Sequence, residues 1–452
     1  MEQKTALYRT IWRWHFYAGL FVMPFILILS VTGAIYLFKP QVERWEERSF
    51  QGLPTSNAVS PNAQLAAALA AFPNSRFDSY RLPERSGDAA LIHIALADGE
   101  NMRDVFVSPQ GTVLGSLDPD MRIMEIDSKI HGSLLAGRIG GWMVELAASW
   151  AIVMILTGLY LWWPNKETGG RRGLAGVVWP RLRSGKRIFW RDLHAVTGFW
   201  VSGLALLLLI TGMPWASVWG DAFKMARTEL GLVNGVQDWK IGGKEAGAKD
   251  VGNAHAEHDH GAMIKMQAAN IPLISLSNIV AKAKNENMAF PVLIKAPDSK
   301  NAMAWTVKSN AQDRSLRATI TYDLATGKEM TRENFADRHP IDRAVGYGIA
   351  WHEGQLFGWI NQVIGVLTAL ALITLMISGF LLWRRRRPVG ALGALGAPPV
   401  SQLPPRIGGV VIGTLILALL LPMLALSLIA LFFIDRFVLM RIPSLRTWLG
   451  MA

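Results

Sequence analysis

Long apolar stretches alternate along this chain with longer stretches in which polar and apolar residues are mixed. Five of the apolar stretches have the length, about 17 residues or more, that a helix needs to cross a bilayer. They cover residues 14–38, 146–163, 193–220, 354–383 and 407–434. The first is too long for the apolar region of a signal peptide and lacks a small-residue cleavage site before Lys39-Pro40, so we interpret it as an uncleaved anchor. The pattern predicts an integral membrane protein built from helices.

The two longest mixed stretches each contain the pattern of a helix followed by an antiparallel hairpin. Apolar and polar residues alternate in short β-prone runs, and turn signals separate these runs. The expected elements are helices at 62–71 and 276–284 and strands at 89–96, 103–117, 302–308 and 319–330, with turns inside 103–117 and 319–330. We therefore expect two small α+β modules of one type.

Together these patterns predict an α-helical integral membrane bundle with four core spans, a fifth C-terminal span and two small exterior α+β modules. The chain consists of two copies of a span–module–span unit, followed by the fifth span. The predicted segments are spans 1–38, 142–163, 193–220, 354–383 and 407–434, modules 39–141 and 221–353, a basic loop 164–192, a linker 384–406 and a tail 435–452.

Basic residues predict the orientation of the spans. Lys and Arg are frequent before the first span, in the loop 164–192 and in the run Arg384–Arg387 after the fourth span. Short loops that are dense in Lys and Arg stay in the cytoplasm, so the N-terminus is expected inside and both modules outside. A fifth span would leave the tail outside. Arg436, Arg441 and Arg446 argue against that placement, and an interfacial or re-entrant final segment is the alternative.

Composition narrows the possible chemistry. The chain has no cysteine, which excludes disulfides, cysteine-ligated iron–sulfur clusters and haem attached through a C-x-x-C-H motif. The net charge of +12 is explained by the basic flanks of the spans and by contact with anionic lipids. The lipid bilayer is therefore the expected partner of this charge, and no nucleic acid is expected.

Four histidines occupy matching positions of an internal repeat. His15 and His194 are each followed by Gly after four residues and by Thr-Gly after seventeen. His131 and His352 are each followed by Leu after four residues, by Gly after six and again by Gly after 27. Each of these runs opens or continues into an apolar span. The repeat thus defines two pairs of equivalent histidines.

The predicted topology sorts the pairs by depth. His15 and His194 begin spans near the cytoplasmic face, and we call them the inner pair. His131 and His352 precede spans on the outer side, and we call them the outer pair. Two opposed imidazoles on facing helices can ligate the iron of a haem. Because covalent attachment is excluded, the sequence predicts haem b, with two haems as the expected number.

The expected helix lengths place the inner and outer histidines at different depths relative to the bilayer core. From His15 to Gly33 a helix rises about 27 Å, which nearly crosses a bilayer core of about 30 Å. From His131 to Gly158 the rise would be about 40 Å, so a continuous helix would hold His131 beyond the core. A break at Gly140-Gly141 could fold His131 back. In both cases the outer pair would lie close to the exterior modules.

Other residues have both a functional and a plain structural interpretation. Each of the four histidines could merely anchor a helix end or bond to a carbonyl. His255, His258 and His260 in the motif HAEHDH could bind zinc, copper or ferric iron, or could belong to a solvated exterior segment. Arg13, Arg191, Arg138 and Arg343 are candidates for contact with haem carboxylates, or could be solvated arginines that set the topology. Glu145 is either an interfacial charge or a partner of a haem-site group.

Several of these motifs together resemble one family. The first span WRWHFYAGLFVMPFILILSVTGAIYLF, the openings HGSLLAG and HEGQLFG, and the turns VSPQGTVLG and YDLATGKEM resemble the PepSY-associated transmembrane family. This family includes iron-regulated membrane proteins and inner-membrane siderophore reductases. The resemblance implies PepSY-like exterior modules, a place in the bacterial inner membrane, bound haem and a role in iron uptake, with reduction of ferric siderophores as its best-defined activity.

The resulting hypothesis is a haem b protein that carries electrons to a ferric siderophore or another ferric chelate outside. The chain has no dinucleotide fingerprint and no recognisable flavin domain, so the electrons are expected from quinol or from a cytoplasmic donor. There are two alternatives. The modules could bind or regulate a partner without redox chemistry, or the protein could assist transport of haem or a metal chelate.

Overall fold

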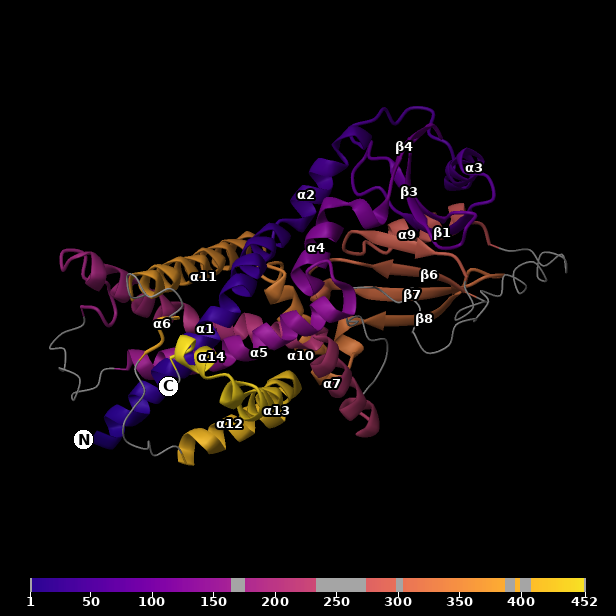
Figure 1. Cartoon of the computed structure of the whole chain (residues 1–452). Coiled ribbons are helices and arrows are strands. Elements are labelled where there is room, and N and C mark those ends of the chain that lie inside the picture. The colour runs from indigo at the N-terminus through magenta and orange to yellow at the C-terminus, as the bar shows by residue number, and fades with distance from the viewer. Residues whose placement is uncertain are drawn as a thin grey trace.

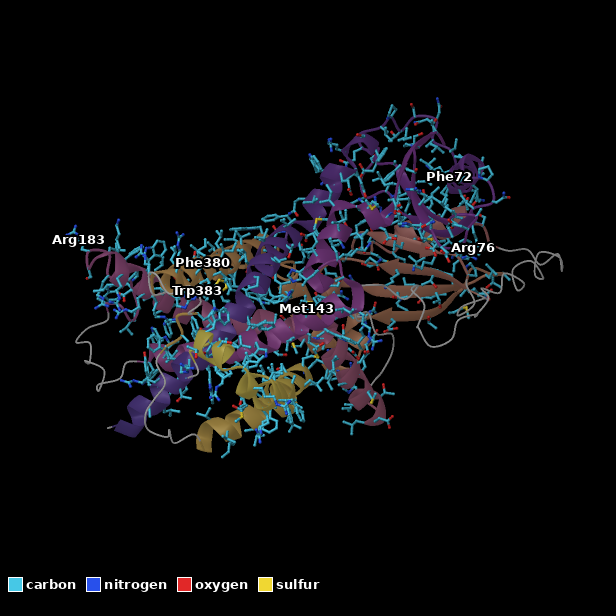
Figure 2. All side chains as sticks on the ribbon, in the orientation of Figure 1. Phe72, Arg76, Met143, Arg183, Phe380 and Trp383 are labelled. Carbon is cyan, nitrogen blue, oxygen red and sulfur yellow. The ribbon has the colours of Figure 1, made fainter. Side chains whose placement is uncertain are left out.

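A computed structural model describes residues 2–163, 175–232, 274–297, 304–386, 395–398 and 408–450. At one end of the molecule lies a β-sheet with its covering helices, and a bundle of long helices extends away from it (Figure 1). Figure 2 places Phe72 and Arg76 at the sheet end, and Arg183 of the basic loop at the opposite end of the bundle. We refer to these as the sheet end and the basic end.

Five helices among the described residues are long and apolar enough to cross a membrane. Four of them form the bundle: α1 (Glu2–Tyr36), α5 (Gly137–Trp162), α6 (Lys186–Gly212) and α11 (Trp359–Arg386). Helix α1 packs on α5 and α11, and α6 packs on the same two helices, so α1 and α6 stand at opposite corners of a ring. Val22, Ala151 and Met376 fill its interior, whereas outward-facing Leu367 and Leu370 remain more than half exposed. An apolar exterior of this kind fits a lipid bilayer, and the chain is a multi-pass membrane protein.

The two modules combine into one antiparallel sheet. Its eight strands follow the order β4-β3-β2-β1-β5-β6-β7-β8, so each module supplies four adjacent strands and β1 pairs with β5 at the centre. The strands are β1 (Arg76–Arg81), β2 (Ala90–Ala95), β3 (Met102–Val107), β4 (Val113–Leu117), β5 (Val292–Lys295), β6 (Ala304–Ser309), β7 (Ala318–Asp323) and β8 (Glu329–Asn334). The predicted strands are confirmed, while β1, β5 and the joining of the two sheets were not predicted.

Helices α3 (Pro61–Ala71) and α9 (Leu276–Asn285) cover the sheet where the sequence predicted helices. Ser60 and Ser275 cap them by accepting hydrogen bonds from the backbone N–H three residues later. Ala68 and Ile279 then enter one continuous apolar core with strand residues such as Ile92. The two modules thus form a single folded body.

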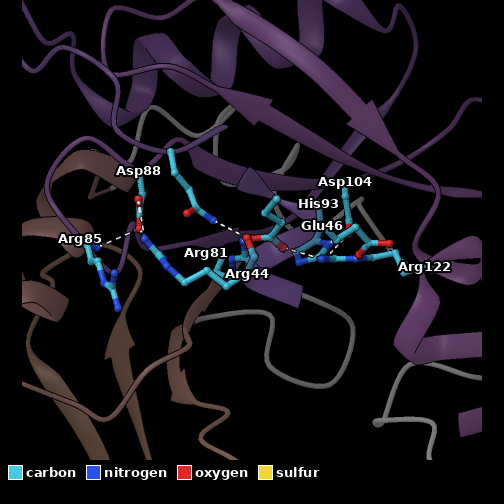
Figure 3. A network of polar contacts seen from close by, with 10 residues as sticks. Arg44, Glu46, Arg81, Arg85, Asp88, His93, Asp104 and Arg122 are labelled. Carbon is cyan, nitrogen blue, oxygen red and sulfur yellow. Dashed lines mark hydrogen bonds and ion pairs between the residues drawn. The ribbon is translucent and has the colours of Figure 1, made fainter. Parts of the chain in front are cut away.

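Helices α4 (Ile123–Ser133) and α10 (Pro340–His352) connect the sheet to the bundle. A network of charges joins α4 to α2 (Lys39–Glu46) and to the first module (Figure 3). Within it, Arg122 pairs with Glu46 at 2.8 Å and with Glu47 at 2.6 Å, and His93 pairs with Asp104 at 2.6 Å. In the second module, Arg227 of α7 (Ser217–Glu229) pairs with Asp342 of α10 at 2.7 Å, with both side chains buried. These contacts fix the positions of α4 and α10.

The break after His131 lies earlier than predicted. Helix α4 ends at Ser133, and Leu134, Leu135 and Gly137 have φ angles of +50°, +57° and +55° before α5 begins. Gly140 and Gly141 lie inside α5, so neither a continuous helix nor a break at these residues, the two alternatives from the sequence, is what the structure has. The reversal itself, which folds His131 back onto the bundle, is present. Its second copy follows α10, where Gly354 and Gly358 have φ angles of +75° and +56°.

The final apolar stretch was predicted as one span and is instead two helices. Helix α12 (Gly408–Leu420) ends before Pro422, whose ring cannot continue the helix, and α13 (Pro422–Phe437) packs back against α12. The following α14 (Pro443–Trp448) lies at the start of α1, where Arg13 donates to the carbonyl of Gly450 at 2.9 Å. Both ends of the described chain therefore lie at the basic end (Figure 1).

Short 3-10 helices complete the fold. They are η1 (Arg48–Phe50), η2 (Pro119–Met121), η4 (Met213–Trp215), η5 (Arg314–Leu316), η6 (Phe335–Asp337) and η7 (Leu439–Arg441). Two of them, η4 and η5, lie beside the candidate site.

Candidate functional site

The inner pair lies inside the four-helix ring. His15 of α1 and His194 of α6 face each other from opposite corners, with ring centroids 6.5 Å apart and ring planes at 79°. The two helices thus bring together residues that are 179 positions apart in the sequence. The pairing that the repeat predicts is present in the structure.

The outer pair lies at the sheet end of the same ring. His131 and His352 come from the last turns of α4 and α10, with ring centroids 6.3 Å apart and ring planes at 80°. Burial, with a smaller contribution from His352, lowers the pKa of His131 to about 4. Burial also lowers the pKa of His352. Both imidazoles are therefore neutral at ordinary pH, which is the form that ligates metals.

Each of the four imidazoles is held at Nδ1 by a hydroxyl group on a neighbouring helix. The bonds join His15 to Thr157 at 3.0 Å, His194 to Ser378 at 3.0 Å, His131 to Thr32 at 2.9 Å and His352 to Thr211 at 3.2 Å. In His194 and His352 the same nitrogen also lies within 3.2 Å and 3.0 Å of a backbone carbonyl. The same contact, between an imidazole Nδ1 and a hydroxyl group of a neighbouring helix, thus occurs at all four histidines.

The hydroxyl groups determine the tautomer. Each of the four donates its own proton to a carbonyl of its helix, as Thr157 does to Val153 at 2.8 Å and Thr32 to Ile28 at 2.9 Å. The hydroxyl oxygen can then only accept from the imidazole, so Nδ1 carries the proton. The lone pair is left on Nε2, the nitrogen available to a metal.

A glycine follows each of these hydroxyl residues and makes room for the imidazole. A Cβ atom would lie 3.2 Å from His131 at Gly33, 3.1 Å from His15 at Gly158, 3.2 Å from His352 at Gly212 and 3.4 Å from His194 at Gly379. The sequence spacing singled out these glycines but not Thr157 and Ser378. The signal that would have found them is a Ser/Thr-Gly dipeptide in each of the four bundle helices.

The spacing of each pair suits one metal ion between two imidazoles. Ligands placed about 2 Å from an ion on opposite sides would hold their ring centroids roughly 6 Å apart. Across the described ranges, no group of three or more His, Asp or Glu residues could hold a metal ion. Within the described residues, an ion bound at either pair would therefore take at most two of its ligands from such side chains.

The other predicted site residues have different roles in the structure. Glu145 accepts from the backbone N–H groups of Val218 at 2.7 Å and Trp219 at 3.0 Å, so it caps the start of α7. Arg13 bonds to Tyr17 and to the tail, Arg191 pairs with Asp192, and Arg138 lies over the ring of Trp142. His255, His258 and His260 lie outside the described residues.

Comparison with known proteins agrees with this architecture. No curated protein sequence matches the chain. The family described as the PepSY-associated TM region matches residues 12–386, a range that includes all four paired histidines and most of the chain. The protein therefore belongs to the PepSY-associated transmembrane family.

Proposed function

We propose that this protein is a haem b electron carrier of the bacterial inner membrane that reduces a ferric chelate, such as a ferric siderophore, on the outer side. The observation that carries the proposal is the presence of two opposed histidine pairs at the two ends of one helix ring. His15 with His194 would hold one haem, and His131 with His352 would hold the other. When bound, haem supplies one-electron chemistry at its iron.

The donor set supports haem over a bare metal ion. Each pair provides two neutral imidazole ligands on opposite sides, and a porphyrin would supply the four ligands between them. Zinc, by contrast, normally takes four ligands from protein side chains in structural sites and three in catalytic sites. The absence of cysteine from the sequence leaves only non-covalent haem.

The position of the two pairs supports transfer along the bundle. The inner pair lies toward the basic end, where a cytoplasmic donor or quinol would deliver electrons. The outer pair lies against the sheet end, where an exterior chelate would accept them. Each electron reduces one ferric iron to ferrous iron, which hard oxygen chelators bind more weakly, so reduction would release the metal.

A reduced-minus-oxidised optical spectrum of the purified protein tests the proposal. We expect b-type bands from protein produced with adequate haem supply. A ferrous-iron trap should then report reduction of ferric siderophores by the chemically reduced protein. A colourless protein would contradict the haem assignment. Haem bands without any ferrous product would instead indicate a role in haem or chelate handling.

The hydroxyl group of Thr32 provides a sharper test of the outer pair. Thr32→Val keeps the shape of the side chain but removes the acceptor of the His131 Nδ1–H bond. Outer-shell partners of this kind typically contribute about 10- to 100-fold in metal affinity, so haem retention at the outer pair should fall by a comparable factor. Titration of haem into apoprotein measures the change. Thr374→Val is the control, because that hydroxyl donates only within its own helix, to Leu370. An equal loss in both variants would contradict this role of Thr32.

A further inference from the structure

An aromatic residue and a cation lie together at the sheet end of both α1 and α6. Tyr36 follows Gly33 by three residues and Trp215 follows Gly212 by three, so the two aromatic residues are equivalent in the repeat. Lys39 lies over the Tyr36 ring at 5.6 Å, and Arg314 lies over the Trp215 ring at 5.8 Å. Lys39 begins α2 of the first module, whereas Arg314 belongs to η5 of the second.

This group of residues adjoins the outer pair. The Trp215 ring meets the His352 ring edge-on, with centroids 5.8 Å apart and planes at 85°. The next residue after His352 is Glu353, whose carboxylate lies 3.8 Å from Arg314. Arg314 and Glu353 are only 8% and 7% exposed, although both carry charge. The two buried charges compensate each other beside the candidate site.

Both cations lie near the carboxylate of Glu353. Burial opposes the charged form of Lys39, but Tyr36, Glu43 and Glu353 together raise its pKa, so it remains protonated. The carboxylate paired with Lys39 is that of Glu43 at 3.8 Å, and Leu37, two residues before Lys39, accepts a hydrogen bond from the Gln355 side chain at 3.0 Å. This contact places Lys39 near Glu353. At 3.8 Å its contact with Arg314 is an ion pair rather than a hydrogen bond. The arrangement is one cation from each module, each lying over one of two aromatic residues that are equivalent in the repeat.

We propose that Lys39 and Arg314 bind the paired carboxylates of the outer haem, an inference that rests on the proposed function. Haem carries two carboxylates on one edge, and the fold brings one cation from each module close to the outer pair. The guanidinium of Arg314 can hold a carboxylate through two parallel N–H bonds, whereas Lys39 acts as a point charge. The modules would thereby become part of the cofactor site.

The experiment compares the midpoint potentials of the two haem components in Arg314→Gln, Lys39→Gln and the double variant. A nearby cation favours the reduced form, so its loss should lower the potential of the component that His352→Ala removes. We expect about a tenfold change in the ratio of reduced to oxidised haem, or about 59 mV for one electron. The inner component should not change. Arg314→Lys should restore part of the shift, because it keeps the charge.

Arg103→Gln is the matched control, since Arg103 is a cation of the first module that pairs with Asp118 at 3.5 Å, away from this group. Haem content and chelate kinetics separate the possible results. An outer potential and haem content that stay unchanged in the double variant would overturn the inference. So would a rise in KM for an anionic ferric chelate with an unchanged potential, because the cations would then bind the chelate. A wild-type protein without haem bands would instead overturn the proposed function itself.

Discussion

His194→Ala should remove one of the two b-type components and leave the other in place. The variant removes one ligand of the inner pair, while the outer pair is built from α4 and α10 and does not include this residue. The haem-to-protein ratio should therefore fall to about half of the wild-type value, as expected when one of two bis-histidine sites is lost. Reduced-minus-oxidised spectra and a haem assay on the same sample measure this directly.

The same variant tests the direction of electron flow. In membrane vesicles, reduction of an exterior ferric chelate by a donor on the basic side should stop, because the proposed electron path begins at the inner pair. Chemical reduction of the remaining outer component should persist. Thr374→Val is the control, since that hydroxyl on α11 bonds within its own helix, to Leu370. Loss of both components in His194→Ala would indicate general misfolding, and loss of neither would contradict the ligand assignment.

The pairing of the histidines could be predicted because it depends on a repeat that is visible in the sequence. Equal offsets from His15 and His194 to glycines show that two spans have equivalent faces, and the basic flanks assign their depth. The partners at Nδ1 depend on a different relation, namely which helices become neighbours in the ring. Thr157 contacts His15 because α5 packs on α1, and no spacing within a single span contains that information.

The sheet and the final helices show where local patterns stop being informative. Alternation identified the outer strands, but β5 has only four residues, and its pairing with β1 joins segments more than 200 residues apart. The final stretch looked like one span because its composition is uniformly apolar. Pro422 was the available signal for a break, since the proline ring excludes a hydrogen bond that a continuous helix requires.

The reversal after His131 could have been located more closely from the repeat. Gly137 and Gly358 match in the two halves, and both adopt a positive φ at the reversal. Leu134 and Leu135 also have a positive φ. Because bulky residues rarely adopt this conformation, their sequence offers no reason to expect it. A break at Gly140-Gly141 was considered because two adjacent glycines weaken a helix. In the structure, Gly140 instead permits a close contact between two helices.

Gly140 allows α5 to approach the end of α4. A Cβ atom at this position would lie 1.7 Å from the carbonyl oxygen of Ser133 and 2.6 Å from its carbonyl carbon. Both are backbone atoms, so no change of rotamer can relieve the overlap. Gly140→Ala must therefore move α4 away from α5, at a cost that exceeds the roughly 1–3 kcal/mol of ordinary overpacking. Since α4 ends two residues after His131, the displacement will reach the outer pair.

We accordingly expect Gly140→Ala to lose the outer haem component and to keep the inner one, because His15 and His194 are held by α1 and α6. The spectrum of the variant should resemble that of His352→Ala rather than that of His194→Ala. Gly203→Ala is the matched control, since a Cβ atom there meets nothing within 4 Å on a helix of the same ring. Two components at wild-type potentials in Gly140→Ala would show that α4 does not need this close approach to deliver His131. Selective loss of the outer component would establish that the reversal, as much as the ligand itself, builds that site.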